Sequence, residues 1–196
     1  MRIQTALRGQ SIPRSNQKPV APSPAPDCFT PSEVTLPLLD PKLFSPPDHY
    51  RPGAPSRTRV HELDEPGQRL HLMGRVVDPA GYGVYDADVE VWMADASGRY
   101  GDGPEFHGRG QQITDPSGSF HFHSVKPGRA EGPPCIYLRI KAQDYETRTV
   151  RLLFANEEDN PPGADPPPVE LFAVGEGEDR FWLAETEVVL TPRRRG

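Results

Sequence analysis

Proline and glycine set the strongest limit on how this chain can fold, because 25 prolines and 18 glycines occur among its 196 residues. Proline lacks a backbone donor and its ring clashes with the preceding helical turn, so helix interiors and central strands exclude it. A helix bundle, a coiled coil and a doubly wound α/β domain are therefore excluded. The sequence also contains no apolar run long enough for a membrane-spanning helix, so we expect no contact with a membrane.

The prolines are densest in residues 1–58, among serines and glutamines. Such a composition buries too little apolar surface to offset the entropy lost on ordering. We therefore expect an irregular, extended N-terminal arm over residues 1–58, a folded domain over residues 59–192 and a basic tail over residues 193–196. Within the arm, the apolar segment 34–39 with Leu43 and Phe44 could dock on the domain or on another subunit.

Alternation of apolar and polar residues predicts strands throughout the folded domain. In residues 69–77, for example, Leu70, Leu72 and Val76 share one face, which is the period of a half-buried strand. No segment has the period of an amphipathic helix. The sequence thus predicts an all-β chain, an antiparallel β-sandwich of about seven strands. The strands are expected within residues 69–77, 87–95, 111–114, 119–125, 135–142, 147–154 and 181–190.

The turn at residues 115–118, "DPSG", is expected to join segments 111–114 and 119–125 as a hairpin. Alternation then places Phe120 and Phe122 toward the core. His121 and His123 are expected on the opposite face, toward solvent or a neighbouring subunit.

Charge and cysteine content limit the class of partner and the cellular compartment that we expect. The formal net charge of −6 argues against a nucleic-acid partner, which needs a clustered positive surface. Cys28 and Cys135 lie far apart in the sequence, and the first 25 residues lack the apolar core of a secretory signal. We therefore expect reduced thiols and a cytoplasmic location.

Two long segments carry a resemblance to a known family. Residues 74–100 read "GRVVDPAGYGVYDADVEVWMADASGRY", and residues 108–128 read "GRGQQITDPSGSFHFHSVKPG". The order and spacing of their turns, strands and tyrosine resemble the core signature of the intradiol ring-cleavage dioxygenases, and the likeness extends over about residues 70–190. It implies a β-sandwich holding a non-haem ferric iron, ligated by two tyrosines and two histidines, that opens catechol-like rings with dioxygen.

Matching the family's ligand positions to this sequence leaves one of them intact. Tyr100 falls on the first tyrosine, whereas Ala130 stands in place of the second. Cys135 and Tyr137 fall on the two histidines. The resemblance therefore implies a degraded ferric site, with Tyr100, Cys135 and Tyr137 as the metal-ligand candidates.

Arg151 is the other residue at this site that differs from the family pattern. It falls on a glutamine of the family pattern, and Gly132 falls on the family's arginine. A permanently charged guanidinium a few ångströms from a trivalent cation costs several kcal/mol even at an effective dielectric constant of about 20. Arg151 is thus the candidate partner of a phenolate or a bound anion.

The sequence leaves three functions open. The first, which we favour, is a non-catalytic structural or binding relative without a cofactor, forming a homo- or hetero-oligomer with a related chain. The second is an active oxidoreductase, a non-haem iron dioxygenase of aromatic rings with an atypical ligand set. The third is a metal-free pocket in which Arg151 and Cys135 bind a catechol-like, phenolic or anionic small molecule. Tyr100 or Tyr137 would then act as the acid or base, and Arg151, which grips the ligand, is the third catalytic candidate.

Overall fold

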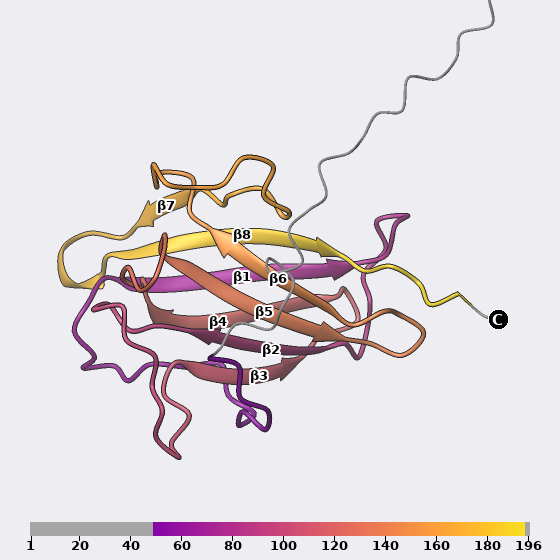
Figure 1. Ribbon diagram of the computed structural model, residues 1–196, viewed down its shortest axis with the longest axis horizontal. Coiled ribbons are helices and arrows are strands. Elements are labelled where there is room, and N and C mark those ends of the chain that lie inside the picture. The colour runs from indigo at the N-terminus through magenta and orange to yellow at the C-terminus, as the bar shows by residue number, and fades with distance from the viewer. Residues whose placement is uncertain (1–48, 195–196) are drawn as a thin grey trace, which may run out of the picture. The chain divides into compact units, whose positions relative to one another are not determined.

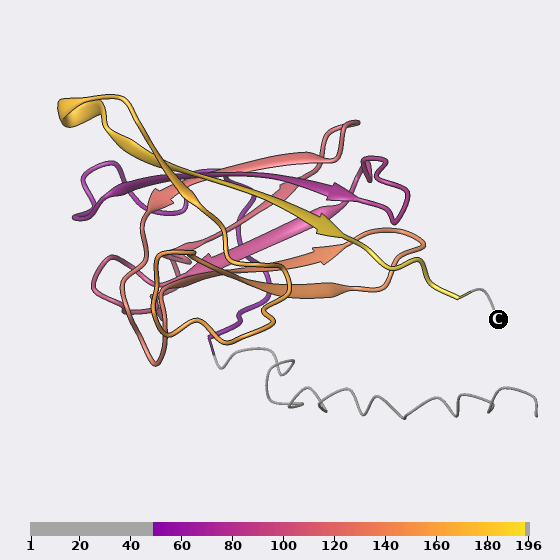
Figure 2. The same ribbon diagram turned by 90° about the horizontal axis from the view of Figure 1, so that it is seen from above.

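The computed structural model describes residues 49–194 as two four-stranded β-sheets packed face to face (Figures 1 and 2). The strand order is β4-β1-β8-β7 in one sheet and β3-β2-β5-β6 in the other. The predicted all-β sandwich is confirmed. The strands are β1 (Arg69–Val77), β2 (Asp88–Met93), β3 (Arg109–Ile113), β4 (Ser119–Val125), β5 (Cys135–Lys141), β6 (Arg148–Leu153), β7 (Leu171–Val174) and β8 (Phe181–Val189).

Several predictions fall on residues outside this range. They concern Cys28 and most of the N-terminal arm, with its apolar segment 34–39, Leu43 and Phe44, and the end of the basic tail. Within residues 49–194, no helix is both long enough and apolar enough to cross a membrane.

The core lies between the two sheets and is built by the alternation read from the sequence. Leu70, Leu72 and Val76 of β1 are buried at 0–1% exposure, and they face the inward residues of β2 and β5. Each fully buried aliphatic side chain contributes about 1.5–3 kcal/mol relative to an exposed one. Because the inner faces are filled with apolar side chains, polar chemistry is restricted to the outer faces and the loops.

Two features of the sheets differ from the sequence-based expectation. An eighth strand, β7, pairs antiparallel with β8, and β1 pairs with β8 in parallel. β7 has four residues and is largely exposed. A strand this short and exposed has no alternation that a sequence pattern could detect.

The predicted hairpin between residues 111–114 and 119–125 is wrong. β3 pairs with β2, whereas β4 pairs with β1 in the other sheet. The turn itself forms, since Asp115 Oδ1 accepts hydrogen bonds from the backbone N–H groups of Ser117 (2.8 Å) and Ser119 (2.9 Å). This turn carries the chain from the β3-β2-β5-β6 sheet to the β4-β1-β8-β7 sheet. Periodicity indicates which face is buried but does not indicate the pairing partner.

The orientation expected for β4 is confirmed. Phe120 and Phe122 are buried at 2% and 0% exposure, and His121 and His123 lie on the opposite face.

Residues 55–60 cover the neighbouring edges of the two sheets. Arg57 N–H donates to the Gln111 carbonyl of β3, and the Thr58 carbonyl accepts a hydrogen bond from the His123 N–H of β4. Paired edges do not offer free backbone groups to another chain. The last part of the predicted arm is therefore bonded to both sheets.

Candidate functional site

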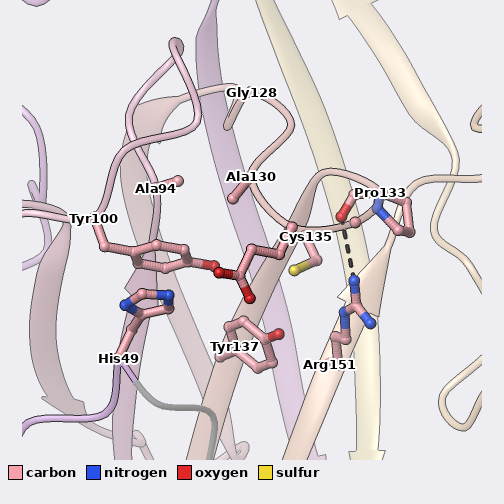
Figure 3. Close-up of a pocket in the computed structure, with 11 residues that line it drawn as sticks. His49, Ala94, Tyr100, Gly128, Ala130, Pro133, Cys135, Tyr137 and Arg151 are labelled. Atoms are coloured by element: carbon pink, nitrogen blue, oxygen red, sulfur yellow. Dashed lines mark hydrogen bonds between the residues drawn. The ribbon is translucent and has the colours of Figure 1, made fainter.

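A cavity of about 240 Å³ lies on the outer face of the β3-β2-β5-β6 sheet, where β5 begins and β6 ends. Tyr100, Cys135, Tyr137 and Arg151 line it together. Figure 3 shows Tyr100 entering from one side and Arg151 from the other, with Cys135 and Tyr137 between them. The structure thus brings together all four candidate residues that the sequence singled out. The rest of the lining consists of His49, Ala94, Gly128, Ala130, Glu131, Gly132 and Pro133.

Strand register brings Tyr137 and Arg151 together. Tyr137 pairs with Trp92 of β2 on one side and with Arg151 of β6 on the other. The Trp92 and Tyr137 rings stack with centroids 5.3 Å apart, and the Arg151 guanidinium carbon lies 5.9 Å from the Tyr137 ring centroid. Cys135 lies two residues earlier on β5 and so shares the face of Tyr137.

Tyr100 is positioned by the turn that follows β2. Asp95 Oδ1 accepts hydrogen bonds from the backbone N–H groups of Ser97 (2.8 Å) and Arg99 (2.9 Å), which reverses the chain just before Tyr100. Gly98 has φ +85°, and a Cβ there would collide with the Arg129 carbonyl. Glycine is therefore required, because the turn adopts a left-handed conformation and packs directly on the loop that carries Ala130.

Ion pairs and a backbone hydrogen bond fix the opposite wall, loop 126–134. Gly128 N–H donates to the Asp95 carbonyl at 2.9 Å, which ties the loop to the Tyr100 turn. Lys126 pairs with Glu157 at 3.4 Å, and Arg129 pairs with Asp159 at 2.7 Å. Both walls of the cavity are thus anchored to neighbouring segments.

His49 is a pocket residue that sequence reasoning missed. Its imidazole stacks on the Tyr100 ring, with centroids 3.9 Å apart and planes 8° from parallel. Its carbonyl accepts a 2.7 Å hydrogen bond from Nη2 of Arg109, a side chain at 1% exposure. His49 belongs to the proline-rich segment assigned to the arm, where no periodic pattern indicates which residues contact the domain.

Burial keeps both phenols of the cavity protonated. Desolvation, reinforced by the nearby Cys135 thiol, raises the pKa of Tyr100 and of Tyr137 well above the ordinary value of 10.0. Arg151 opposes this effect on both groups but does not outweigh it. At neutral pH the cavity therefore presents two neutral hydroxyl groups, each able to donate a hydrogen bond.

Arg151 carries a charge that forms no ion pair with a carboxylate of residues 49–194, although the exposed Glu131 also lines the cavity. Its Nη2 donates to the Pro133 carbonyl at 3.3 Å, whereas its Nε is buried without a hydrogen-bond partner. Among residues 49–194 it forms no ion pair. Burial alone would lower the pKa of Arg151, but Cys135 and Tyr137 raise it, so the group stays charged.

The guanidinium of Arg151 also lies next to position 132. A Cβ placed on Gly132 would come 3.2 Å from its Nη2. The side chain from β6 therefore occupies space beside the loop position that the family pattern gives to arginine.

Across the described part of the chain, no group of three or more histidine, cysteine, aspartate or glutamate side chains has the geometry to hold a metal ion. Tyrosine oxygens are the other possible donors, and two of them converge here with one sulfur. A metal in this cavity would thus meet the Tyr100 and Tyr137 phenols and the Cys135 thiol, together with the His49 imidazole and the Glu131 carboxylate of the lining.

Comparison with known proteins gives a consistent family assignment. A family profile described as Dioxygenase matches residues 46–158, more than half of the chain. The protocatechuate 3,4-dioxygenase alpha chain of Pseudomonas putida is 37% identical over 86 residues, which are 39% of this chain and 43% of that protein. The corresponding beta chain of Burkholderia cepacia is 39% identical over 71 residues, which are 32% of this chain and 30% of that protein. Each match spans less than half of the relative's length.

Solved structures share the fold. The 3-chlorocatechol 1,2-dioxygenase of Rhodococcus opacus 1CP superposes with a TM-score of 0.65 at 23% identity, over 74% of this chain and 70% of that one. The dioxygenase domain of a dioxygenase and carbohydrate-binding fusion from Streptomyces sp. SirexAA-E gives 0.62 at 26% identity, over 74% and 93%. At 23% identity the first of these likenesses concerns the fold alone.

Proposed function

This chain belongs to the intradiol ring-cleavage dioxygenase family, and on that premise we propose that it is a non-catalytic binding relative. Its pocket holds a phenolic or carboxylate small molecule, with no ferric iron. The observation that carries the proposal is the Arg151 guanidinium, charged and without an ion-pair partner among residues 49–194, inside the cavity lined by the residues that the resemblance assigns to the family's ligand positions.

The donor set does not fit ferric iron. Of the residues at the family's ligand positions only Tyr100 keeps its type, and neither imidazole remains. Binding Fe³⁺ would require deprotonation of two phenols whose pKa values are raised by burial. It would also place the trivalent ion in one cavity with Arg151, which stays charged and repels it.

The same groups suit an organic anion. Arg151 offers the Nη protons that are not bonded to the Pro133 carbonyl, and a carboxylate or phenolate accepts such charge-assisted hydrogen bonds. The Tyr100 and Tyr137 hydroxyls donate to the same ligand because they are protonated at neutral pH. The stacked His49–Tyr100 and Trp92–Tyr137 rings provide apolar surface for an aromatic body.

One observation favours a second function, an active ring-cleaving oxidoreductase. Tyr100, Cys135 and Tyr137 converge in the cavity, and ferric iron accepts phenolate and thiolate donors. A related chain could complete such a site, and the alpha and beta chain names of two relatives are compatible with such assembly.

Two measurements on the full-length chain test the proposal. The first is iron content and visible absorption after expression with iron supplied, together with oxygen uptake on catechol, protocatechuate and hydroxyquinol. We expect little iron, no phenolate-to-iron colour and no turnover. Stoichiometric ferric iron with that colour, or turnover of any of the three compounds, would establish the second function instead.

The second measurement is calorimetric titration with protocatechuate, which carries both a carboxylate and phenolic hydroxyls. We expect Arg151→Met to weaken binding about tenfold or more, the value of one charge-assisted hydrogen-bonded pair. The matched control is Arg148→Met on the same strand, whose guanidinium bonds Asp165 at 2.7 Å outside the cavity. Equal affinity in wild type and Arg151→Met, or no binding to wild type, would contradict the proposal.

A further inference from the structure

A second group of polar side chains lies on the outer face of the other sheet, β4-β1-β8-β7. Arg59 pairs with His123 of β4 through an isolated parallel bridge, and His123 pairs with His71 of β1. The three side chains therefore form a row across adjacent segments. Arg69 precedes His71 by two residues on β1 and so extends the same face.

These residues surround a cavity of about 270 Å³ that is separate from the Arg151 pocket. Its lining includes Arg59, His61, Arg69, His71 and His123, with the loop 62–67 on one side. Ring contacts hold the histidines in place. His71 stacks on Phe181 of β8 at 4.0 Å and meets His123 edge-on at 4.3 Å between centroids. The imidazoles are thus presented in a fixed orientation.

Two arginines and two histidines of this cavity have no polar side-chain partner in the part of the chain that the structure describes. Among residues 49–194, the side chains of Arg59, Arg69, His71 and His123 form no hydrogen bond or ion pair. Arg75, which lies on the same face of β1, differs in being paired with Glu187 at 3.4 Å. Two guanidinium groups and two imidazoles therefore keep their donors available.

The electrostatic surroundings of the two imidazoles are positive. After burial, the charges that lower the pKa of His71 are Arg59, Arg69 and His121, and those that lower the pKa of His123 are His71, His121 and Arg59. The carboxylates near the cavity are Glu62 and Glu65 of its lining. Glu65 is bound by His107 at 3.2 Å.

We propose that this cavity, formed by Arg59, Arg69, His71 and His123, binds a small phosphate-bearing dianion such as a phosphate monoester. Guanidinium and imidazole donors on three adjacent segments match the several acceptor oxygens of a tetrahedral anion. The cavity volume suits a small molecule. The formal net charge of −6 of the whole chain disfavours a nucleic acid, which would approach the acidic remainder of the surface.

Calorimetric titration of the full-length protein with inorganic phosphate, and separately with inorganic sulfate, tests this site. Sulfate is a dianion at all working pH values, so it separates binding from phosphate protonation. We expect both anions to bind at constant ionic strength. Arg59→Gln and Arg69→Gln should each weaken binding about tenfold, the loss of one charge-assisted contact. Arg75→Gln is the control, since it removes a cation of the same face that already has a partner.

Imidazole chemical shifts measured by NMR during the titration give a second readout. We expect the His71 and His123 signals to move and the His49 signal, at the other cavity, to stay. If chloride at equal concentration displaces phosphate, or if Arg59→Gln and Arg75→Gln lose equal affinity, the cavity binds an adventitious ion only. Either result would overturn the proposal. So would a single-stranded oligonucleotide that binds while phosphate and sulfate do not. Circular dichroism of each variant checks that it is folded.

Discussion

Two neighbouring rows of side chains on the β3-β2-β5-β6 sheet each contain an arginine, and the two arginines have different partners. In one row, Glu90 of β2 pairs with Arg139 of β5, and the carboxylate accepts a 3.1 Å hydrogen bond from the guanidinium. In the next row, two residues along β5, Tyr137 pairs with Arg151. The first arginine faces a carboxylate, and the second faces a neutral phenol.

The two rows therefore have different roles on one surface: the Glu90–Arg139 row stabilises the fold, and the Tyr137–Arg151 row is available to bind a ligand. Glu90 is 5% exposed, and it also accepts a 2.9 Å hydrogen bond from the Tyr50 hydroxyl and pairs with Lys141 at 3.4 Å. Its charge is fully compensated, so this row has no capacity left for a ligand. The Arg151 row has the opposite balance, since its cation is desolvated but not neutralised. A bound anion would supply what that row lacks.

The largest effect in this comparison is expected for Arg139→Met. Removing the guanidinium leaves the buried Glu90 carboxylate with weaker partners, so the free energy of unfolding should fall by about 3 kcal/mol. Urea denaturation measures the change. Lys141→Met is the control, because that side chain is 38% exposed and its removal should cost under about 1 kcal/mol. Similar losses in the two variants would show that Glu90 does not depend on the closer pair.

The phenols of the second row predict an effect at alkaline pH. The pKa of Tyr137 is raised above its ordinary value of 10.0, first by burial and then by Cys135. Below pH 10 the phenol is neutral in both folded and unfolded chains. As the pH rises above 10, the unfolded chain releases this proton first, and stability is lost until the folded pKa is reached.

Tyr137→Phe removes that titration, so its alkaline unfolding, followed by circular dichroism, should begin at higher pH than in wild type. Tyr85→Phe is the control, because the Tyr85 side chain is 65% exposed. If both variants unfold at the wild-type pH, desolvation of Tyr137 is not significant for stability.

Local patterns predicted the parts of this structure that depend on neighbouring residues in the chain. The inward face of β1, the outward His121 and His123 and the turn at Asp115 are each encoded within a few residues. Strand partners are not encoded in this way, which is why β3 and β4 were wrongly joined as a hairpin. β7 was missed because an exposed strand of four residues has no burial pattern.

In the site, too, some features could be predicted from the sequence and others depend on residues far apart in the chain. The resemblance to a family placed Tyr100, Cys135, Tyr137 and Arg151 at one location, and all four line one cavity. Whether they bind iron or an organic ligand depends on their charges and is still a prediction. His49 was not predicted, because its place over Tyr100 depends on the hydrogen bond that its carbonyl accepts from Arg109, 60 residues away in the sequence.

The smallest effect is expected for the stability of Arg151→Met. The substitution loses a 3.3 Å hydrogen bond to the Pro133 carbonyl and the cation–π contact with Tyr137, but it removes an unpaired, half-buried charge. These contributions oppose each other, so the free energy of unfolding should stay within about 1 kcal/mol of wild type. Urea denaturation of Arg151→Met beside Arg139→Met makes the comparison direct, because both replace an arginine on the same face by a side chain of similar length. A loss as large as that of Arg139→Met would mean that Arg151 is compensated within the protein, and the reason for expecting a bound anion would disappear.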